Sequence, residues 1–259
     1  MDGRLIVVTG TSRGIGQGIA QFLAQEGADV AGVDWHEGDE TRELAGERFV
    51  HFQGDVSSSD DVARVFSEID AAYGRPPWGL VCVAGIAPEV DFLDTTPEVF
   101  DAVMGVNVRG PFLCGQQAGR RMRDAGGGRI VNIASTASVQ SWAQQSVYGT
   151  SKGAVLLLTR NMANELARFG ITVNAVGPGT ITTPLAANVL SNPDWVAAEL
   201  GTTPIRRFGT PRDIAVGVRF FLQPEAEWVT GQTLYVDGGF LACGGPWLES
   251  FEGHVSIER

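Results

Sequence analysis

The chain has 259 residues, a formal net charge of −11 at pH 7 and a mean hydropathy of +0.04. The acidic balance disfavours nucleic acid and anionic membranes as partners. No apolar run approaches the roughly 18 residues of a membrane-spanning helix, and an apolar fraction of 44% is ample for the core of a single domain.

The cysteines and histidines argue against a metal centre and against a disulfide framework. The cysteines are odd in number and neither residue type has the spacing of a ligand set. These residues are Cys82, Cys114 and Cys243, and His36, His51 and His254. The chain enters its first predicted strand without a signal peptide, so we expect a cytoplasmic location.

The amino-terminal segment has the pattern of a strand, a glycine turn and a helix. Leu5–Thr9 is an apolar, β-branched run typical of a buried parallel strand, and residues 17–25 carry apolar side chains at helical spacing. Glycines between them permit a tight turn and let backbone N–H groups approach a pyrophosphate at the positive end of the helix. The predicted dinucleotide contacts of this turn are Gly10, Ser12, Arg13, Gly14, Ile15 and Gly16.

A second strand is predicted over residues 29–33, with Asp34 and Trp35 at its carboxyl end. A carboxylate there accepts hydrogen bonds from the ribose hydroxyls of NAD and repels the 2′-phosphate of NADP. Arg13 favours the opposite preference, because a guanidinium pairs with phosphate. Like charges about 4 Å apart cost about 4 kcal/mol at an effective dielectric near 20, whereas an exposed ion pair gains about 1 kcal/mol. We therefore expect NAD to be preferred over NADP.

Strand and helix patterns alternate along the rest of the chain. This alternation predicts a doubly wound α/β fold in a single domain, with a parallel sheet, right-handed crossovers and helices on both faces. Further strands are predicted over Phe49–Gln53, 79–83, 129–133, 172–176 and Thr233–Val236. Further helices are predicted over Ser59–Tyr73, 97–123, 147–169 and Pro211–Leu222.

Tyr148 and Lys152 stand four residues apart in a predicted helix, so they share one face, and Ser135 precedes the tyrosine by thirteen residues. A phenol with an ordinary pKa near 10 is a poor acid–base group at neutral pH, and a fixed positive charge nearby favours phenolate. Moving that pKa to about 7 requires roughly 4 kcal/mol, which a lysine and an oxidised nicotinamide ring together can supply. The pattern predicts Tyr148 as a proton-transfer group and Lys152 as its electrostatic partner.

Several separated motifs together resemble the short-chain dehydrogenase/reductase family over residues 5 to about 240. In chain order the motifs are Thr9-Gly10-x-x-x-Gly14-Ile15-Gly16, Asp55-Val56, Gly105-Val106-Asn107-Val108, the trio of Ser135, Tyr148 and Lys152, Pro178-Gly179-Thr180-Ile181-Thr182-Thr183, Thr230-Gly231-Gln232, and Val236-Asp237-Gly238-Gly239. The resemblance implies a seven-stranded Rossmann sheet, interconversion of a secondary alcohol and its ketone with NAD(P), and a homotetramer.

The resemblance also implies roles for individual residues. In the implied catalytic tetrad of Ser135, Tyr148, Lys152 and Asn107, the serine positions the substrate oxygen and the asparagine anchors a water linked to the lysine. Lys152 also holds the nicotinamide ribose. The other implied cofactor contacts are Asp55 and Val56 at the adenine, Ala84 and Gly85 at the adenosine ribose, and Pro178, Gly179, Ile181 and Thr183 at the nicotinamide and pyrophosphate, with Asn107, Tyr148 and Lys152 as further contacts.

One motif departs from the family pattern. Where the family usually has Asn-Asn-Ala-Gly after the fourth strand, this chain has Cys82-Val83-Ala84-Gly85. The two missing amides brace the central strands, so we expect apolar packing to replace their hydrogen bonds. Cys82 is then predicted to be a buried, unreactive thiol.

Residues 184–209 lie outside the alternation and resemble the family's substrate-covering insertion. One or two short helices are predicted between residues 184 and 200, with a break at Asn192-Pro193-Asp194. The predicted substrate contacts are Ser135, Ile86, Ala137, Trp142, Gln145 and Trp195, with Ala87, Val189 and Leu190 as further wall residues. Each wall residue other than Ser135 could equally serve only to pack the lid.

Within the single predicted domain, residues 1–135 form the cofactor-binding half and residues 136–240 the catalytic and substrate half. Residues 241–259 form a tail with three large apolar side chains, Trp247, Leu248 and Phe251. Such groups near a terminus usually need a partner surface, so we expect them to reach a neighbouring subunit.

Three functions compete. The favoured one is an NAD-dependent dehydrogenase of a small, alicyclic or aromatic secondary alcohol that serves catabolism, with no metal. An NADPH-dependent 3-oxoacyl-thioester reductase is favoured by Arg13 and by a basic group suited to an acidic carrier protein, but is disfavoured by Asp34 and the acidic total. That basic group consists of Arg120, Arg121, Arg123 and Arg129. A non-catalytic dinucleotide sensor on the same fold is disfavoured by the complete tetrad.

Overall fold

A computed structural model of the protein describes residues 1–243. In this part of the chain one seven-stranded sheet has the order β3-β2-β1-β4-β5-β6-β7, and every pairing is parallel. The strands are β1 (Leu5–Thr9), β2 (Asp29–Asp34), β3 (Phe49–Gln53), β4 (Gly79–Cys82), β5 (Gly128–Ile133), β6 (Ile171–Pro178) and β7 (Thr233–Val236). The strand order reverses between β1 and β4, which places a cleft at the carboxyl ends of the central strands. The predicted doubly wound single-domain fold is confirmed.

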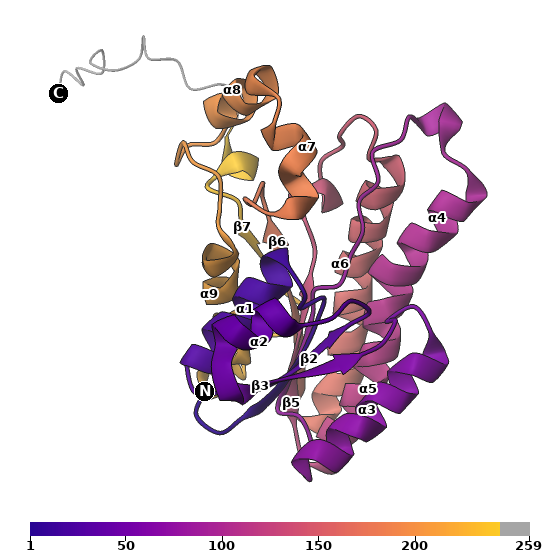
Figure 1. Cartoon of the computed structure of the whole chain (residues 1–259), viewed down its shortest axis with the longest axis vertical. Coiled ribbons are helices and arrows are strands. Elements are labelled where there is room, and N and C mark those ends of the chain that lie inside the picture. The colour runs from indigo at the N-terminus through magenta and orange to yellow at the C-terminus, as the bar shows by residue number, and fades with distance from the viewer. Residues whose placement is uncertain (244–259) are drawn as a thin grey trace, which may run out of the picture.

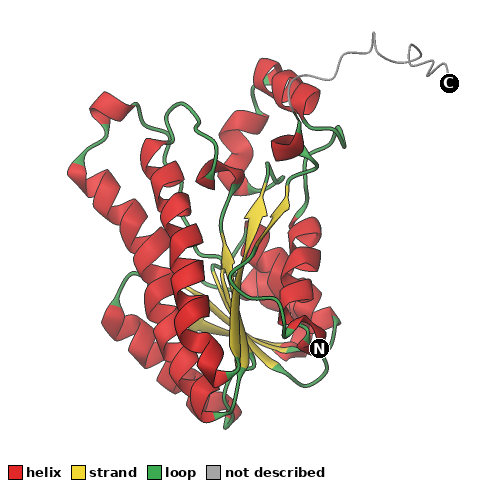
Figure 2. Ribbon diagram, turned by 180° about the vertical axis from the view of Figure 1, so that it is seen from behind, coloured by secondary structure: helices red, strands yellow, loops and turns green. Residues whose placement is uncertain are grey.

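Helices cover both faces of the sheet, as Figure 1 shows, and the view from behind in Figure 2 shows the sheet enclosed between two helical layers. One layer contains α1 and α9, which pack against each other, and the other contains α3, α5 and α6. The helices are α1 (Gly14–Gln25), α2 (Asp39–Ala45), α3 (Ser59–Tyr73), α4 (Pro97–Met104), α5 (Gly110–Asp124), α6 (Ser146–Leu166), α7 (Ala187–Leu190), α8 (Pro193–Thr202) and α9 (Pro211–Leu222).

Alternate residues of β1 supply the two halves of the core. Val8 belongs to the cluster that contains Ile19 of α1 and Leu222 of α9. Val7 belongs to the opposite cluster with Phe66 of α3, and all five of these side chains are at most 1% exposed. Burial of each such side chain stabilises the fold by about 1.5–3 kcal/mol. A strand that is buried on both faces explains why β1 reads as a continuous apolar run.

The helix predicted over residues 97–123 is interrupted. A π-helical segment, Gly105–Arg109, separates α4 from α5, and Pro111 stands in the first turn of α5. Proline lacks the N–H of a regular helix and its ring clashes with the carbonyl four residues earlier, which here belongs to Asn107. The wider turn relieves that clash and sets the orientation of Asn107. The short helix α2 was not predicted, although Asp39 and Glu40 in its first turn suit a helix start.

The predicted break in the insertion is confirmed. Asn192 caps α8, since its Oδ1 accepts hydrogen bonds from the backbone N of Asp194 at 3.1 Å and of Trp195 at 3.2 Å. Helices α7 and α8 stand above the carboxyl edge of the sheet (Figure 1). Within the described residues no helix is long and apolar enough to cross a membrane. The tail residues Trp247, Leu248 and Phe251 lie outside the described residues.

Candidate active site

A cleft of about 1290 Å³ opens at the carboxyl ends of the strands. Its lining includes each predicted substrate residue, Ser135, Ile86, Ala137, Trp142, Gln145 and Trp195. It also includes each predicted cofactor residue except Asn107. Ala87 and Val189 line the cleft as expected, whereas Leu190 does not. Residues spread over most of the chain therefore converge on one cavity large enough for a dinucleotide and a small substrate.

Two glycines of the turn leave no room for a Cβ, and a third has a left-handed backbone conformation that favours glycine. Gly10 has φ +73°, and a Cβ there would lie 2.7 Å from the Cα of Ala84. A Cβ on Gly16 would lie 2.0 Å from the carbonyl oxygen of Gly10, and Gly14 has φ +62°. These three positions require glycine, and they bring bare backbone to the amino terminus of α1. Such a turn fits the pyrophosphate of a dinucleotide.

Asp34 is tied to the same turn. Its Oδ2 accepts a hydrogen bond from the backbone N of Ser12 at 2.9 Å, and its Oδ1 accepts one from the backbone N of His36 at 3.0 Å. The residue is 9% exposed, while the neighbouring Trp35 is 64% exposed, and both line the cleft. Arg13 is exposed and also lines the cleft. The Asp34 carboxylate, which would bind the ribose of NAD, and the Arg13 guanidinium, which would bind the 2′-phosphate of NADP, thus both lie at the cofactor end of the cleft.

The adenine end is formed by the segment after β3. The Oδ1 of Asp55 accepts hydrogen bonds from the backbone N and the Oγ of Ser57, both at 2.8 Å. Gly110 packs on the side chain of Val56, because a Cβ on that glycine would lie 2.9 Å from a Val56 methyl carbon. Asp55 is therefore oriented by its own loop, with Val56 held against the start of α5.

Tyr148 lies in the first turn of α6, and Ser135 caps the 3₁₀ turn Thr136–Ser138, two residues beyond the end of β5. The Ser135 Oγ accepts a hydrogen bond from the backbone N of Ala137 at 3.1 Å. Burial raises the pKa of the Tyr148 phenol, and a hydrogen bond with the Ser135 hydroxyl lowers it in part. The predicted lowering towards 7 depends on an oxidised nicotinamide ring as well as on Lys152, and it stays a prediction.

Lys152 is buried beneath the tyrosine. It is 5% exposed, and its Nζ donates a hydrogen bond to the Ile133 carbonyl oxygen at 2.8 Å. The same Nζ lies 5.8 Å from the centroid of the Tyr148 ring. Burial lowers the pKa of Lys152 from its ordinary 10.5 to about 8. The ammonium is therefore close enough to influence the phenol, and its own charge is destabilised by burial.

Asn107 lies behind the cleft wall and not on its surface. It is 1% exposed, and its Nδ2 donates to the Ile86 carbonyl oxygen at 2.9 Å and to the Ser151 Oγ at 3.0 Å. Its Oδ1 accepts a hydrogen bond from the Ile86 backbone N at 2.9 Å. The cofactor contact predicted for Asn107 stays a prediction, and in this structure its side chain braces the backbone after β4.

Cys82 and Val83, which stand at the end of β4 where the family usually has two asparagines, are buried or braced as expected. Cys82 and Cys114 are buried in one core cluster, and burial raises the pKa of both thiols, that of Cys114 to about 12. The Thr9 Oγ1 accepts hydrogen bonds from the backbone N of Val83 at 3.0 Å and of Ala84 at 3.2 Å. Packing and one threonine hydroxyl thus brace the central strands.

Two stacked aromatic pairs form part of the substrate end. Trp142 stacks on Phe240 with ring centroids 5.6 Å apart, and Trp195 stacks on Phe208 with centroids 6.1 Å apart. The prediction did not include several further lining residues near this end, among them Glu89, Gln144, Leu185 and Asn188. Each of these four stands within three residues of one that was predicted, so proximity in sequence was the available signal.

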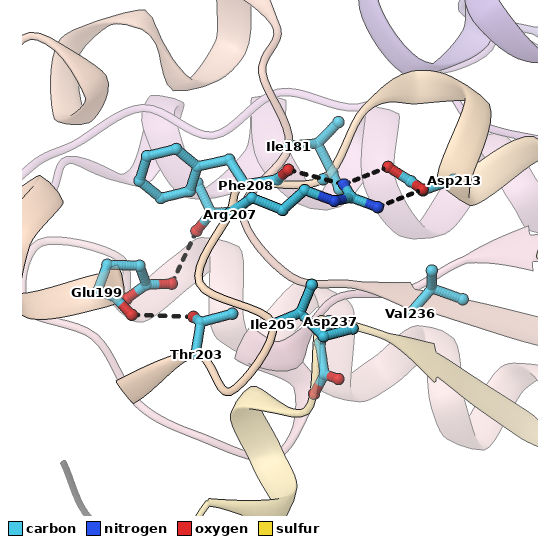
Figure 3. A pocket seen from close by; sticks show the side chains of 12 residues that line it. Ile181, Glu199, Thr203, Ile205, Arg207, Phe208, Asp213, Val236 and Asp237 are labelled. Atoms are coloured by element: carbon cyan, nitrogen blue, oxygen red, sulfur yellow. Dashed lines mark hydrogen bonds and ion pairs between the residues drawn. The ribbon is translucent and has the colours of Figure 1, made fainter. Parts of the chain in front are cut away.

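A second, smaller cavity of about 110 Å³ lies under α8. Figure 3 shows Glu199 at its edge, joined to Thr203, and the Arg207 guanidinium facing Asp213. Glu199 is 6% exposed and its Oε1 accepts a hydrogen bond from the Thr180 Oγ1 at 2.9 Å. Thr180 lies between Gly179 and Ile181, so this buried carboxyl joins the lid to the segment predicted to meet the nicotinamide. Burial raises its pKa.

Comparison with known proteins agrees with this arrangement. Residues 10–241 match a family described as enoyl-(acyl carrier protein) reductase. The 2-dehydro-3-deoxy-D-gluconate 5-dehydrogenase of Escherichia coli is 35% identical over 246 residues, which cover 93% of this chain and 97% of that protein. The (3R)-3-hydroxyacyl-CoA dehydrogenase of Canis lupus familiaris is 34% identical over 249 residues, covering 91% and 95% respectively. A solved short-chain type dehydrogenase/reductase from Mycobacterium ulcerans has a TM-score of 0.88 and 30% identity, covering 96% of this chain and 94% of that one.

The chain belongs to the short-chain dehydrogenase/reductase family. It is an NAD(P)-dependent oxidoreductase that acts on CH–OH groups and interconverts secondary alcohols and ketones. Within residues 1–243 no group of three or more potential ligands could hold a metal ion.

Proposed function

We propose that Tyr148 is the acid–base group of this oxidoreductase and that NAD is its preferred nucleotide. The observation that carries the proposal is the convergence of Ser135, Tyr148 and Lys152 on the cleft that also contains the glycine turn and Asp34. A phenol, a hydroxyl and a buried ammonium side by side suit proton transfer to and from an alcohol oxygen.

In the proposed reaction the alcohol hydroxyl lies between Ser135 and Tyr148. The nucleotide, when bound, supplies the hydride acceptor for oxidation and the hydride donor for reduction. The Tyr148 phenolate accepts the hydroxyl proton during oxidation, and neutral Tyr148 returns it during reduction. Ser135 donates a hydrogen bond to the substrate oxygen, and the Lys152 ammonium stabilises the phenolate and binds the nicotinamide ribose. General acid–base catalysis of this kind contributes about 10²–10⁴ in rate.

The contribution proposed for Asn107 is structural. Its three hydrogen bonds to Ile86 and Ser151 support the start of the loop after β4, and Ser151 in turn donates to the Tyr148 carbonyl oxygen at 2.7 Å. Asn107 is thereby connected to the turn of α6 that carries the tyrosine. Gly85 lies next to both Asn107 and Lys152. A Cβ on this glycine would be 3.3 Å from the Asn107 Oδ1 and 3.7 Å from the Lys152 Nζ.

The preference for NAD rests on Asp34. Its carboxylate is largely buried and stands at the carboxyl end of β2, where the adenosine ribose binds in this fold. A 2′-phosphate would meet that negative charge, while the compensation available from Arg13 is weak because the guanidinium is exposed.

The thioester-reductase alternative is less well supported, because most of the basic group that favoured it is engaged within the protein. Arg121 forms a bidentate ion pair with Asp70, and Arg123 pairs with Asp124. Arg129 is 5% exposed and its guanidinium stacks over Trp78 at 4.8 Å. Arg120 is exposed and makes no ion pair within the described residues, so it is the one member of the group that remains available to an acidic carrier. A non-catalytic nucleotide sensor is disfavoured by the complete acid–base group in the cleft.

We further propose a cytoplasmic homotetramer. Helices α4, α5 and α6 expose Phe100, Phe112 and Leu157 at 44%, 45% and 59%, which suits burial against a second subunit. The buried thiols Cys82 and Cys114 are free, which suits a reducing compartment.

A parallel assay tests this function. Secondary alcohols and the matching ketones would be offered with NAD(H) and with NADP(H), and nucleotide absorbance followed. We expect alcohol-dependent reduction of NAD at a higher kcat/KM than of NADP. Higher efficiency with NADP would contradict the nucleotide assignment.

A further inference from the structure

The substrate end of the cleft contains one buried cation that is already engaged. Lys152 donates a hydrogen bond to the Ile133 carbonyl oxygen, and its burial leaves the ammonium beneath Tyr148. Its charge is needed beside the phenol in the proposed reaction. A substrate carboxylate or phosphate would therefore need a second cationic side chain in the cleft to form an ion pair.

The two other lysine or arginine residues that line the cleft lie at the cofactor end. Arg13 belongs to the glycine turn. Arg109 is exposed immediately before Gly110, the glycine that packs against Val56 at the adenine end. Within the described residues, no arginine or further lysine lines the substrate end.

The substrate end does contain an acid. Glu89 is exposed and lines the cleft. The neighbouring Val90 donates its backbone N–H to the Gln144 carbonyl oxygen at 3.0 Å, which places the loop after β4 beside the loop after β5. A negatively charged substrate would thus meet a like charge at Glu89, with no counter-charge at this end other than the engaged Lys152.

Three amide side chains on two walls are available for uncharged partners. Gln144, Gln145 and Asn188 line the cleft, and within the described part of the chain none of these side-chain amides makes a hydrogen bond. By contrast, the amide of Asn192 is occupied in capping α8. Each free amide offers both a donor and an acceptor to hydroxyl or carbonyl oxygens. Gln144 has φ +62°, a strained backbone that the Val90 hydrogen bond helps to hold.

The other walls are flat and apolar. The Trp142 ring is backed by Phe240 and the Trp195 ring by Phe208, with interplanar angles of 20° and 15°. Stacking restricts the motion of each indole, so both present defined faces. Such faces suit the carbon skeleton of a ring.

We propose that the substrate is an uncharged cyclic secondary alcohol that carries at least one further hydroxyl or carbonyl oxygen. The reacting hydroxyl lies at Ser135 and Tyr148, the ring lies between the indoles, and the further oxygen bonds to the amides. This inference rests on the proposed function of the site.

Matched pairs of probes test the charge and the second oxygen separately. The probes are 3-hydroxycyclohexanecarboxamide against 3-hydroxycyclohexanecarboxylate, myo-inositol against its 1-phosphate, and cyclohexane-1,2-diol against cyclohexanol. We expect the uncharged member of each charge pair, and the diol, to have a kcat/KM at least about tenfold higher, which corresponds to about 1.4 kcal/mol. Faster turnover of the charged members, or of cyclohexanol, would overturn the inference and leave the proposed oxidoreduction intact. If no probe and no corresponding ketone reacted with either nucleotide, the proposed function would fall and this inference with it.

A pair of variants tests whether the cleft itself sets the preference. Asn188→Lys adds a cation inside the cleft and should raise the kcat/KM ratio of carboxylate to carboxamide at least about fivefold. Gln140→Lys adds the same charge on an exposed residue that does not line the cleft, and should leave the ratio unchanged. Equal changes in the two variants would contradict the assignment, because the effect would then come from overall charge.

Discussion

Asn107 holds the backbone of Ile86 from both sides, with its Nδ2 bound to the carbonyl oxygen and its Oδ1 bound to the amide N, each at 2.9 Å. Ile86 lines the cleft two residues beyond Ala84, whose backbone packs against Gly10 of the cofactor turn. One buried side chain on a π-helical turn thus supports the wall shared by cofactor and substrate.

Asn107→Ala should therefore affect both stability and activity. The loss of hydrogen bonds to buried backbone groups costs about 1–3 kcal/mol in the free energy of unfolding. We expect kcat/KM to fall at least about tenfold, since displaced backbone near reacting groups is costly. Asn174 provides a matched control, because it is equally buried and makes the same paired contacts to the Val229 carbonyl oxygen and the Gln232 N. Asn174→Ala should lose similar stability with little loss of kcat/KM, and equal losses of activity would refute the special role of Asn107.

Asp34→Ala should shift the nucleotide preference towards NADP. Removal of a largely buried carboxylate relieves a repulsion of up to about 4 kcal/mol, which solvent reduces, so we expect the ratio of kcat/KM with NADP to that with NAD to rise about 10–100-fold. The variant also frees the Ser12 N, so the efficiency with NAD should fall. Asp55→Ala makes the same change of charge at the adenine end and should weaken both nucleotides alike. An unaltered ratio in the Asp34 variant would remove the basis for the NAD preference.

Lys152 should lower stability at neutral pH while serving the reaction. Its pKa in the folded state is about 8 against an ordinary 10.5, so the unfolded chain binds more protons between these values. The contribution of Lys152 to the free energy of unfolding is therefore lowest below about pH 8. It rises as pH increases from about 8 to 10.5, by about 3 kcal/mol at most. Lys152→Met should abolish turnover and remove this rise, which thermal unfolding of the two proteins across that pH range would measure. A wild-type Tm that fell relative to the variant over that range would contradict the sign.

Glu199 should have the opposite pH dependence. Burial raises its folded-state pKa above the ordinary 4.5, so its contribution is fully present below about pH 4.5 and is lost as pH rises through the folded-state value. Glu199→Gln keeps an acceptor for the Thr180 hydroxyl and cannot ionise, so the difference in Tm between variant and wild type should grow in the variant's favour as pH increases from 4 to 8. Glu165→Gln, on an exposed residue of α6, is the control. A constant difference for the Glu199 variant would show that its ionisation has no part in stability.

Local patterns were sufficient for the strands and for the glycine turn. Residues 5–25 contain a β-branched run, a glycine turn and an amphipathic helix in direct succession, so each element is indicated by its own neighbours. The motif residues Ser135, Tyr148 and Lys152 could be chosen because their spacing resembles a known family, and the structure brings them to one cleft.

Contacts between segments that are distant in the chain could not be predicted from the sequence. The hydrogen bonds of Asn107 to Ile86 join residues 21 positions apart and depend on the wide turn before Pro111. The burial of Glu199 could not be expected either, because a carboxylate on a short helix usually faces solvent. The pKa of Tyr148 also depends on how deeply the fold buries the phenol, which its spacing from Lys152 does not specify.

The most direct test of the account is Tyr148→Phe, measured in parallel for nucleotide binding and for alcohol oxidation. Removal of one hydroxyl should leave the Kd for NAD within about twofold while kcat falls by about 10²–10⁴, since the proton acceptor is lost and the ring remains. Tyr73→Phe is the control, because the Tyr73 hydroxyl bonds only to the Val30 carbonyl oxygen within the described residues and lies outside the cleft. It should retain near-normal kcat. Near-normal turnover in Tyr148→Phe would contradict the assignment of Tyr148 as the proton-transfer group.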